Sequence, residues 1–383
     1  MDMDVPDLPY LIKILKYSGH YYNVSGRWAN FIRAFQKLRL IINATAMSMS
    51  VWALTIGGLR SSLGIEMTYA CLTIMTTVQH FHMYRNRTRT EAIIATFQEI
   101  RNTYQKGTDI EFKNYTRFMW KVVKVYIVMI VGICSAMSLP FFADLVVWFV
   151  WETPTAFRIP IGMDSMVDKE PVRDATYFAV VLFSNCWTIL GGVTQMGVDT
   201  FLFVSCYSLS SMVKTFCKQL KVPPNSTPEE TTAHIRLLAA HQQALYKLQT
   251  EIRRTFGFPF FVQNLLGSFC ICSLLYVMSE NGATLLSQFI YVFNMIAVLM
   301  ILASTAHVAQ HVKNTTSEVF EALYEMNWYT LRPSDRKYLV TMLGVARNPL
   351  RIHFYGLLPL DMENFMSMLN TSYTYFMFLK SIE

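Results

Sequence analysis

The sequence Thr284-Leu-Leu-Ser-Gln-Phe-Ile-Tyr-Val-Phe-Asn-Met-Ile-Ala-Val-Leu-Met-Ile-Leu-Ala-Ser-Thr-Ala306 contains no charged side chain over 23 consecutive positions. An uncharged apolar run of about 18 or more residues predicts a helix that crosses a lipid bilayer. Only 15% of the 383 residues are charged, whereas soluble domains carry about 25%. Seven apolar runs occur, at 40–59, 63–84, 120–143, 177–205, 258–278, 284–306 and 362–382. The sequence therefore predicts an all-α membrane protein with seven transmembrane helices.

The basic residues are divided unequally between the two sides of the membrane. If the N-terminus is cytosolic, the cytosolic segments contain 26 lysines and arginines and the outer segments contain five. Cytosolic loops are enriched in these residues, so we expect a cytosolic N-terminus and an extracellular C-terminus. The net charge of +7 follows from this topology. The chain has no dense basic patch interleaved with aromatic residues, which argues against a nucleic-acid partner.

The pattern divides the chain into four parts. These are a cytosolic N-terminal segment (1–39), a six-helix transmembrane bundle (40–310), a cytosolic helical segment (311–361) and the seventh helix (362–383). Thr227-Pro-Glu-Glu230 is typical of a helix start, and apolar residues recur at helical spacing over 227–255 and 315–330. We therefore expect cytosolic helical extensions that pack against one another or against neighbouring subunits.

The last helix carries the sharpest local signal. Proline in Pro359-Leu360-Asp361 disfavours helix in the residue before it, and Asp361 can cap a new helix. The 21 residues that follow would extend ~31 Å at 1.5 Å per residue, which matches a ~30 Å hydrocarbon core. On a helical wheel, one face of the helix carries Ser367, Asn370, Thr371, Thr374 and Ser381, with Phe378 at its centre and Ile382 at its edge. Two interpretations of this face stay open: interhelical hydrogen bonding, or a water-filled path that bulky apolar residues close. The second requires an oligomer.

No motif points to an enzyme. Serine, histidine and aspartate are not grouped as a catalytic set, the seven cysteines lack zinc-site spacing, and His307 and His311 have no third ligand nearby. The sequence therefore predicts no metal and no cofactor. Asp199 is the only acid in the fourth apolar run. Intramembrane acids are functional candidates, but its position toward the cytosolic end favours a contact between helices.

The C-terminal residues resemble those of a known family. Glu318-Val-Phe-Glu-Ala-Leu-Tyr-Glu-Met-Asn-Trp-Tyr329, Arg336-Lys-Tyr-Leu339, Pro359-Leu360 and Thr371-Ser-Tyr-Thr-Tyr-Phe-Met-Phe-Leu-Lys380 are similar to the signature of insect odorant receptors. The resemblance implies an odorant-gated, cation-permeable tetramer, with the last helix lining the pore and the cytosolic helix ends forming an assembly domain. It places Phe378 and Ile382 at the outer gate. The family's coreceptor has a longer loop between the fourth and fifth spans, so this chain resembles a conventional odour-tuning subunit that pairs with the coreceptor. By the same resemblance, it would lie in the plasma membrane of an olfactory neuron dendrite.

The resemblance also implies a ligand pocket in the outer half of the bundle, among the second, third, fourth and sixth spans. Aromatic residues with few hydrogen-bonding groups favour a small volatile ligand of aromatic or phenolic type. The candidate contacts in these spans are Tyr69, Leu72, Thr73, Ile133, Ala136, Met137, Pro140, Phe178, Leu182, Asn185, Ile189 and Tyr291.

Two other receptor classes stay open at this point. A gustatory-type receptor channel of the same superfamily would share the layout and would self-assemble. A metabotropic seven-helix receptor would have its N-terminus outside, against the distribution of basic residues.

Overall fold

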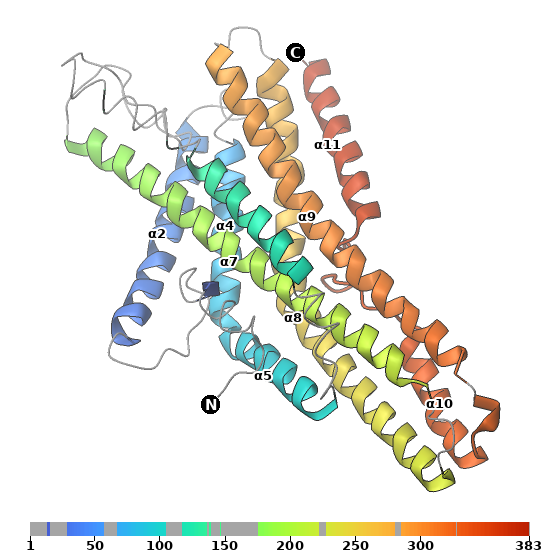
Figure 1. The fold of residues 1–383 in the computed structure, drawn as a ribbon. Helices are drawn as coiled ribbons and strands as arrows, with labels where there is room; N and C mark the ends of the chain where they lie inside the picture. The colour runs from blue at the N-terminus through green and yellow to red at the C-terminus, as the bar shows by residue number, and fades with distance from the viewer. Residues whose placement is uncertain are drawn as a thin grey trace.

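The structure, a computed structural model, describes residues 14–15, 29–56, 67–104, 117–135, 138, 146, 175–221, 227–279, 285–326 and 328–382. The regular elements in these ranges are helices, which confirms the predicted all-α architecture (Figure 1). In chain order they are α2 (Ala29–Ile56), α4 (Met67–Arg85), α5 (Arg87–Tyr104), a helix at Arg117–Ser135, α7 (Ala175–Gln219), α8 (Pro228–Ser279), α9 (Leu285–Tyr324), the 3-10 turn η3 (Trp328–Thr330), α10 (Pro333–Ala346) and α11 (Met362–Ile382).

Among the described residues, five helices are long and apolar enough to cross a membrane: α2, Arg117–Ser135, α7, α8 and α9. The other two predicted spans, α4 and α11, are helices of 19 and 21 residues. Polar side chains lower their mean hydropathy. In α4 these include Gln79 and His80, which are fully buried against neighbouring helices. The helix α11 begins and ends at the predicted residues.

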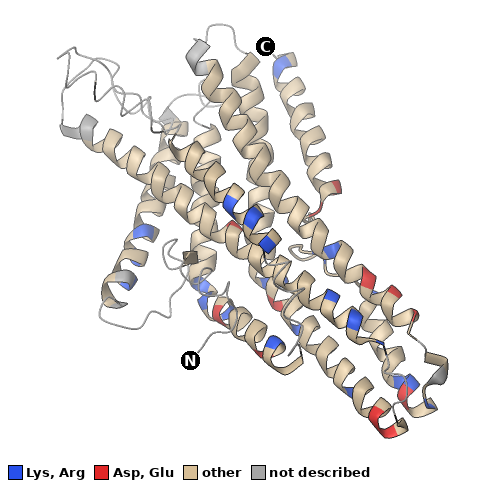
Figure 2. Cartoon of the chain, viewed as in Figure 1, with Lys and Arg blue, Asp and Glu red and all other residues tan. Residues whose placement is uncertain are grey.

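Three helices are much longer than a bilayer requires. α7, α8 and α9 have 45, 52 and 40 residues, and about 20 residues span the hydrocarbon core. Their extra turns meet α10 at the end of the molecule where charged side chains gather, opposite the C-terminus (Figure 2). We call this the charged end. The predicted helical extensions are confirmed.

The sixth predicted span continues as a helix into the segment 315–330, as expected from its apolar spacing. This segment is the last part of α9, which ends at Tyr324 and is followed by η3. No glycine or proline interrupts residues 307–324, so the helix has no reason to break there. The boundary expected between residues 310 and 311 falls inside this helix.

The start of α8 shows why the chain re-enters a helix after α7. The backbone N–H of Glu230 donates to the hydroxyl of Thr227 at 3.3 Å, and the Glu230 carboxylate accepts from the backbone N–H of Thr227 at 2.7 Å. This is a reciprocal capping box. It confirms the helix start predicted from the Thr-Pro-Glu-Glu sequence.

Gln219 at the end of α7 joins three helices at the charged end. Its amide donates to the Tyr104 carbonyl of α5 at 2.9 Å, and its side-chain oxygen lies 3.2 Å from Nδ1 of His241 in α8. The His241 ring stacks on Tyr104 with centroids 4.7 Å apart. Burial lowers the pKa of His241 to about 4. The imidazole is therefore neutral and donates from Nδ1.

A network of buried polar side chains joins four helices within the bundle. Gln79 of α4 donates to Oε1 of Gln263 in α8 at 2.6 Å. Gln195 of α7 donates to the same oxygen at 3.3 Å and to Oδ2 of Asp199 at 2.8 Å. The Tyr126 hydroxyl, from Arg117–Ser135, donates to that same carboxylate oxygen. The predicted interhelical role of Asp199 is confirmed.

Two more buried contacts attach α2 to this bundle. Arg39 donates to the Thr194 hydroxyl and, at 3.2 Å, to the Leu190 carbonyl of α7. Asn43 lies 2.9 Å from Nδ1 of His80 in α4. Both groups are about 1% exposed, so they hold α2 by hydrogen bonds within the apolar part of the bundle.

We expect Asp199→Ala to destabilise the bundle by about 2–4 kcal/mol, because two buried donors lose their acceptor. Asp199→Asn keeps an acceptor of the same shape and should cost less than half as much. The measurement is thermal unfolding of the detergent-solubilised chain.

A double-mutant cycle provides the control. Tyr126→Phe removes one of the two donors, so its cost and that of Asp199→Ala should not add. Wild-type stability of Asp199→Ala would show that this network does not hold the helices together.

Candidate functional site

An aromatic cluster lies where α2, α4 and α7 meet, away from the charged end. Tyr69 of α4 and Trp187 of α7 are 8% and 5% exposed and pack with Ala46 of α2. Leu72 and Phe183 cover this cluster from α4 and α7. The result is a packed, mostly apolar cluster with two large aromatic rings, and side chains of this kind line small-molecule sites.

Several polar atoms near the aromatic cluster are buried and have no hydrogen-bond partner among the described residues. They are Nε1 of Trp187, Oγ of Ser184, Oδ1 of Asn185 and Oγ of Ser50. Ser184 precedes Trp187 by one helical turn, and Ser50 follows Ala46 by one turn. A buried polar atom without a partner costs about 1–3 kcal/mol, so these atoms have hydrogen-bonding capacity that the folded chain does not use.

The structure separates the residues expected to contact ligand. Tyr69, Thr73 and Asn185 are buried, but Leu182 and Ile189 are 60% and 45% exposed on the outer surface of α7. Leu72, Ile133 and Tyr291 are half-buried, and Ile133 packs on the main core rather than on the aromatic cluster. Ala136, Met137 and Pro140 lie outside the described residues, as does the side chain of Phe178.

Phe183, Ser184 and Trp187 face the bundle on α7, and the sequence reasoning did not select them. The signal that marks this face is small residues, which allow helices to approach closely. A Cβ on Gly191 would lie 3.3 Å from the Trp187 ring, and Gly192 lies against Cys134 of the helix Arg117–Ser135. Ser184, Gly191 and Gly192 would therefore have indicated the inner face of α7.

The start of α11 is fixed by its capping residue. Oδ1 of Asp361 accepts from the backbone N–H of Asn364 at 3.0 Å, which confirms the predicted cap. Oδ2 of the same carboxylate pairs with Lys313 of α9 at 3.0 Å, and Asp361 is 5% exposed. One buried acid thus caps α11 and attaches it to α9.

Residues 347–361, which we call the connector, lead from α10 to α11. The Leu350 N–H donates to the Thr316 hydroxyl of α9 at 3.0 Å, and the Leu360 N–H donates to the Ile352 carbonyl at 2.8 Å. Gly257 of α8 lies so close to the connector that a Cβ there would be 2.6 Å from the His353 carbonyl oxygen. The connector is therefore held by both α8 and α9.

The two faces of α11 differ in their surroundings. Phe365 and Met368 are buried against Cys270 and Leu274 of α8 and Leu302 of α9. The opposite, polar face is exposed on this chain; it comprises Ser367, Asn370, Thr371, Thr374, Phe378 and Ser381. The hydroxyls of Thr371, Thr374 and Ser381 donate to carbonyls of α11 itself. Ile382 ends α11, and its side chain is outside the described residues.

Leu72 connects the two parts of this site. It packs against the aromatic cluster of Tyr69 and Trp187 and also against the cluster that buries Phe365 and Met368 of α11. A displacement of α4 at Leu72 would therefore change the packing of both clusters.

A family model described as 7tm Odorant receptor matches residues 61–373. The chain belongs to this family. Its members are receptors rather than enzymes. The chain is 27% identical over 235 residues to Odorant receptor 10 of Aedes albopictus and 20% identical over 208 residues to Odorant receptor 85f of Drosophila melanogaster. These matches cover 60% and 53% of this chain, and they span the same shares of the two relatives.

The fold agrees with that of a solved member of the family. The insect olfactory receptor OR5 from Machilis hrabei, in complex with eugenol, superposes with a TM-score of 0.80 at 12% identity, over 98% of both chains. The structure of OR5 described without that ligand gives a TM-score of 0.78. At this identity the match shows the shared all-helical membrane fold.

Ser184→Ala and Trp187→Phe should test the aromatic cluster as a ligand site. Each removes a buried polar atom that has no partner among the described residues. Trp187→Phe also leaves a small cavity in the core, so the variants are compared at equal surface expression. A lost bond to ligand, worth about 0.5–1.5 kcal/mol, would raise the half-maximal odorant concentration about two- to tenfold.

Leu182→Ala, on the exposed face of the same helix, is the matched control. The comparison is a dose–response curve for each variant at equal surface expression. A larger shift for Leu182→Ala than for the other two would move the site to the outer face of α7.

Gly257→Ala should disturb the connector, because the added Cβ would lie 2.6 Å from a backbone oxygen that has to move. We expect lower surface expression and a lower melting temperature. Gly344→Ala is the control, since a Cβ there meets nothing within 4 Å. It should be neutral or stabilise α10 by about 0.5–1 kcal/mol. Equal behaviour of the two variants would contradict the close approach.

Proposed function

We propose that this chain is the odour-tuning subunit of a ligand-gated, non-selective cation channel. It binds a small volatile, aromatic or phenolic, and opens a pore in a heterotetramer with the odorant coreceptor. It acts in the plasma membrane of an olfactory neuron dendrite. The family supports the receptor role, and the exposed polar face of α11 carries the proposal of a pore.

The two faces of α11 support the proposal of a pore. Phe365 and Met368 attach one face to the bundle, whereas the exposed face carries hydroxyl and amide groups that are costly beside lipid. A single helix cannot enclose a water-filled path, so other subunits have to complete it. With Phe378 at the centre of this face, apolar side chains that meet there would exclude water from a closed pore.

The proposed orientation has the N-terminus and the charged end in the cytosol and the C-terminus outside. The gathering of lysine and arginine at the end away from the C-terminus supports it (Figure 2). Phe378 then lies in the outer half of α11, and α10 and the connector lie in the cytosol.

The aromatic cluster, with polar atoms that have no hydrogen-bond partner among the described residues, supports the proposal of a ligand site. Tyr69 and Trp187 offer ring surfaces, and Ser184 and Trp187 offer hydrogen-bonding groups without partners. A ligand with one ring and one hydroxyl would engage both. The solved relative OR5 is in complex with eugenol, which has this chemistry.

In cells that co-express this chain with the coreceptor, we expect odour-evoked current without added G protein. The Phe378 side chain is 61% exposed on this chain, so it can face a pore. Phe378→Ser should let water into the closed constriction, because it replaces an apolar side chain with a polar one. Whole-cell recording should then show current without odorant or a change in ion selectivity. The effect is partial where the partner subunit keeps its own gate residues.

Phe376→Ser is the matched control. Phe376 is half-buried on the other side of α11, so its loss should lower surface expression without opening a pore. Indistinguishable phenotypes of the two variants would mean that Phe378 does not line the pore.

A further inference from the structure

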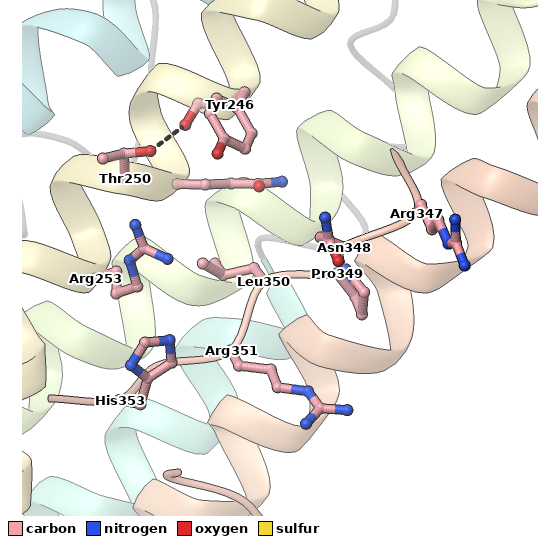
Figure 3. Close-up of a pocket in the computed structure, with 10 residues that line it drawn as sticks. Tyr246, Thr250, Arg253, Arg347, Asn348, Pro349, Leu350, Arg351 and His353 are labelled. Atoms are coloured by element: carbon pink, nitrogen blue, oxygen red, sulfur yellow. Dashed lines mark hydrogen bonds between the residues drawn. The ribbon is translucent and has the colours of Figure 1, made fainter. Parts of the chain in front are cut away.

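A basic cavity of about 450 Å³ lies between α8 and the connector. Arg253 comes from α8, whereas Arg347, Arg351 and His353 come from the connector (Figure 3). Gln249 and Thr250 add polar groups on α8. None of the described residues that line this cavity carries a carboxylate, although Glu251 lies nearby on α8.

The three arginines of the cavity have no ion-pair partner among the described residues. Glu251 of α8 is engaged by Arg254 at 3.4 Å, and the nearby Asp361 is engaged by Lys313. Arg253 is half-buried, so its positive charge is not fully exposed to solvent. A cavity with several unpaired guanidinium groups holds a positive potential that favours a multiply charged anion.

His353 adds a hydrogen-bond donor to the lining of the cavity. Its Nδ1 accepts from the backbone N–H of Gly356 at 2.8 Å, so the ring proton of the neutral imidazole lies on Nε2. Burial and the neighbouring charges of Arg253 and Arg351 lower the pKa of His353.

The cavity lies close to the membrane surface. Arg253 precedes the apolar run 258–278 by five residues, which is about 7.5 Å along a helix. The inner surface of the plasma membrane carries anionic lipids, and juxtamembrane basic groups bind their headgroups. Arginine binds phosphate through paired hydrogen bonds.

From this geometry we propose that the cavity between α8 and the connector binds the phosphorylated inositol headgroup of a phosphoinositide or of a soluble inositol phosphate. The bound phosphates join Arg253 of α8 to Arg351 and His353 of the connector, and so hold the segment that leads into α11. The choice of an inner-leaflet lipid rests on the orientation proposed above, whereas binding of the headgroup does not.

The test measures binding to the full chain in detergent and in its complex with the coreceptor. The probes are dioctanoyl phosphatidylinositol 4,5-bisphosphate, dioctanoyl phosphatidylinositol and inositol 1,4,5-trisphosphate. We expect saturable binding of the bisphosphate lipid and weak binding of the unphosphorylated lipid. Tighter binding of the lipid than of the trisphosphate identifies the membrane as the source, and the reverse order identifies a soluble inositol phosphate.

Arg253→Gln combined with Arg351→Gln should weaken binding about tenfold or more, since charge-assisted hydrogen bonds are lost. Arg254→Gln is the matched control. Arg254 is the residue after Arg253, and its guanidinium pairs with Glu251 instead of lining the cavity. Its replacement removes the same positive charge, and binding should stay within about twofold.

Arg351→Gln alone keeps the test valid if the double variant does not fold, because Arg351 is exposed in the connector. It should still weaken binding severalfold. Equal weakening by Arg254→Gln would show attraction by net charge and overturn the site. So would the absence of saturable binding, or binding to the isolated chain that is lost in the complex.

Discussion

The carboxylate of Asp199 is the constraint on which the helix bundle depends. It is fully buried in a helix that crosses the membrane, where no water is available to solvate it. Its Oδ2 accepts from Tyr126 of one helix and from Gln195 of α7, whereas its Oδ1 has no partner among the described residues. Gln195 and Gln79 in turn donate to one oxygen of Gln263. Helices that meet at one acid cannot slide independently, because each slide leaves a buried donor without its acceptor.

This network also divides the bundle into two functional halves. On one side lies the aromatic cluster of Tyr69 and Trp187, which is apolar and has free polar atoms. On the other side lies the charged end, where Gln219 fixes α5, α7 and α8 to one another. Hydrogen bonds between specific buried partners resist rearrangement, so we expect movement to be easier in the apolar half. Leu72 in that half is the residue that also reaches the cluster beneath α11.

Sequence reasoning predicted those features that depend on local chemistry. The bounds of α11, its Asp361 cap and the Thr227 start of α8 follow from proline positions, capping residues and hydrophobic length. The inner face of α7 did not follow, because α7 is apolar on all sides and its inner face is decided by contacts with distant helices. Leu182 and Ile189 are candidates because the family resemblance places the pocket among spans that include α7, and both side chains are exposed on this chain. The pairing of Lys313 with Asp361 joins residues 48 positions apart, and no local pattern predicts such a contact.

The hydrogen bonds of α11 determine which contacts would have to break if its polar face, the proposed pore lining, moved. Thr371, Thr374 and Ser381 donate to carbonyls of their own helix, so wetting or rotating this face breaks no bond to another helix of the chain. The resistance to opening therefore lies in the apolar contacts at Phe378 and in the attachment at the base of α11. There, Asp361 both caps the helix and pairs with Lys313, and the connector passes against Gly257 of α8. A ligand at the proposed site beside Trp187 would touch none of these groups directly. Among the described residues, the shared clusters offer two routes to α11: a shift of α4 at Leu72, or a movement of α8 and α9 together.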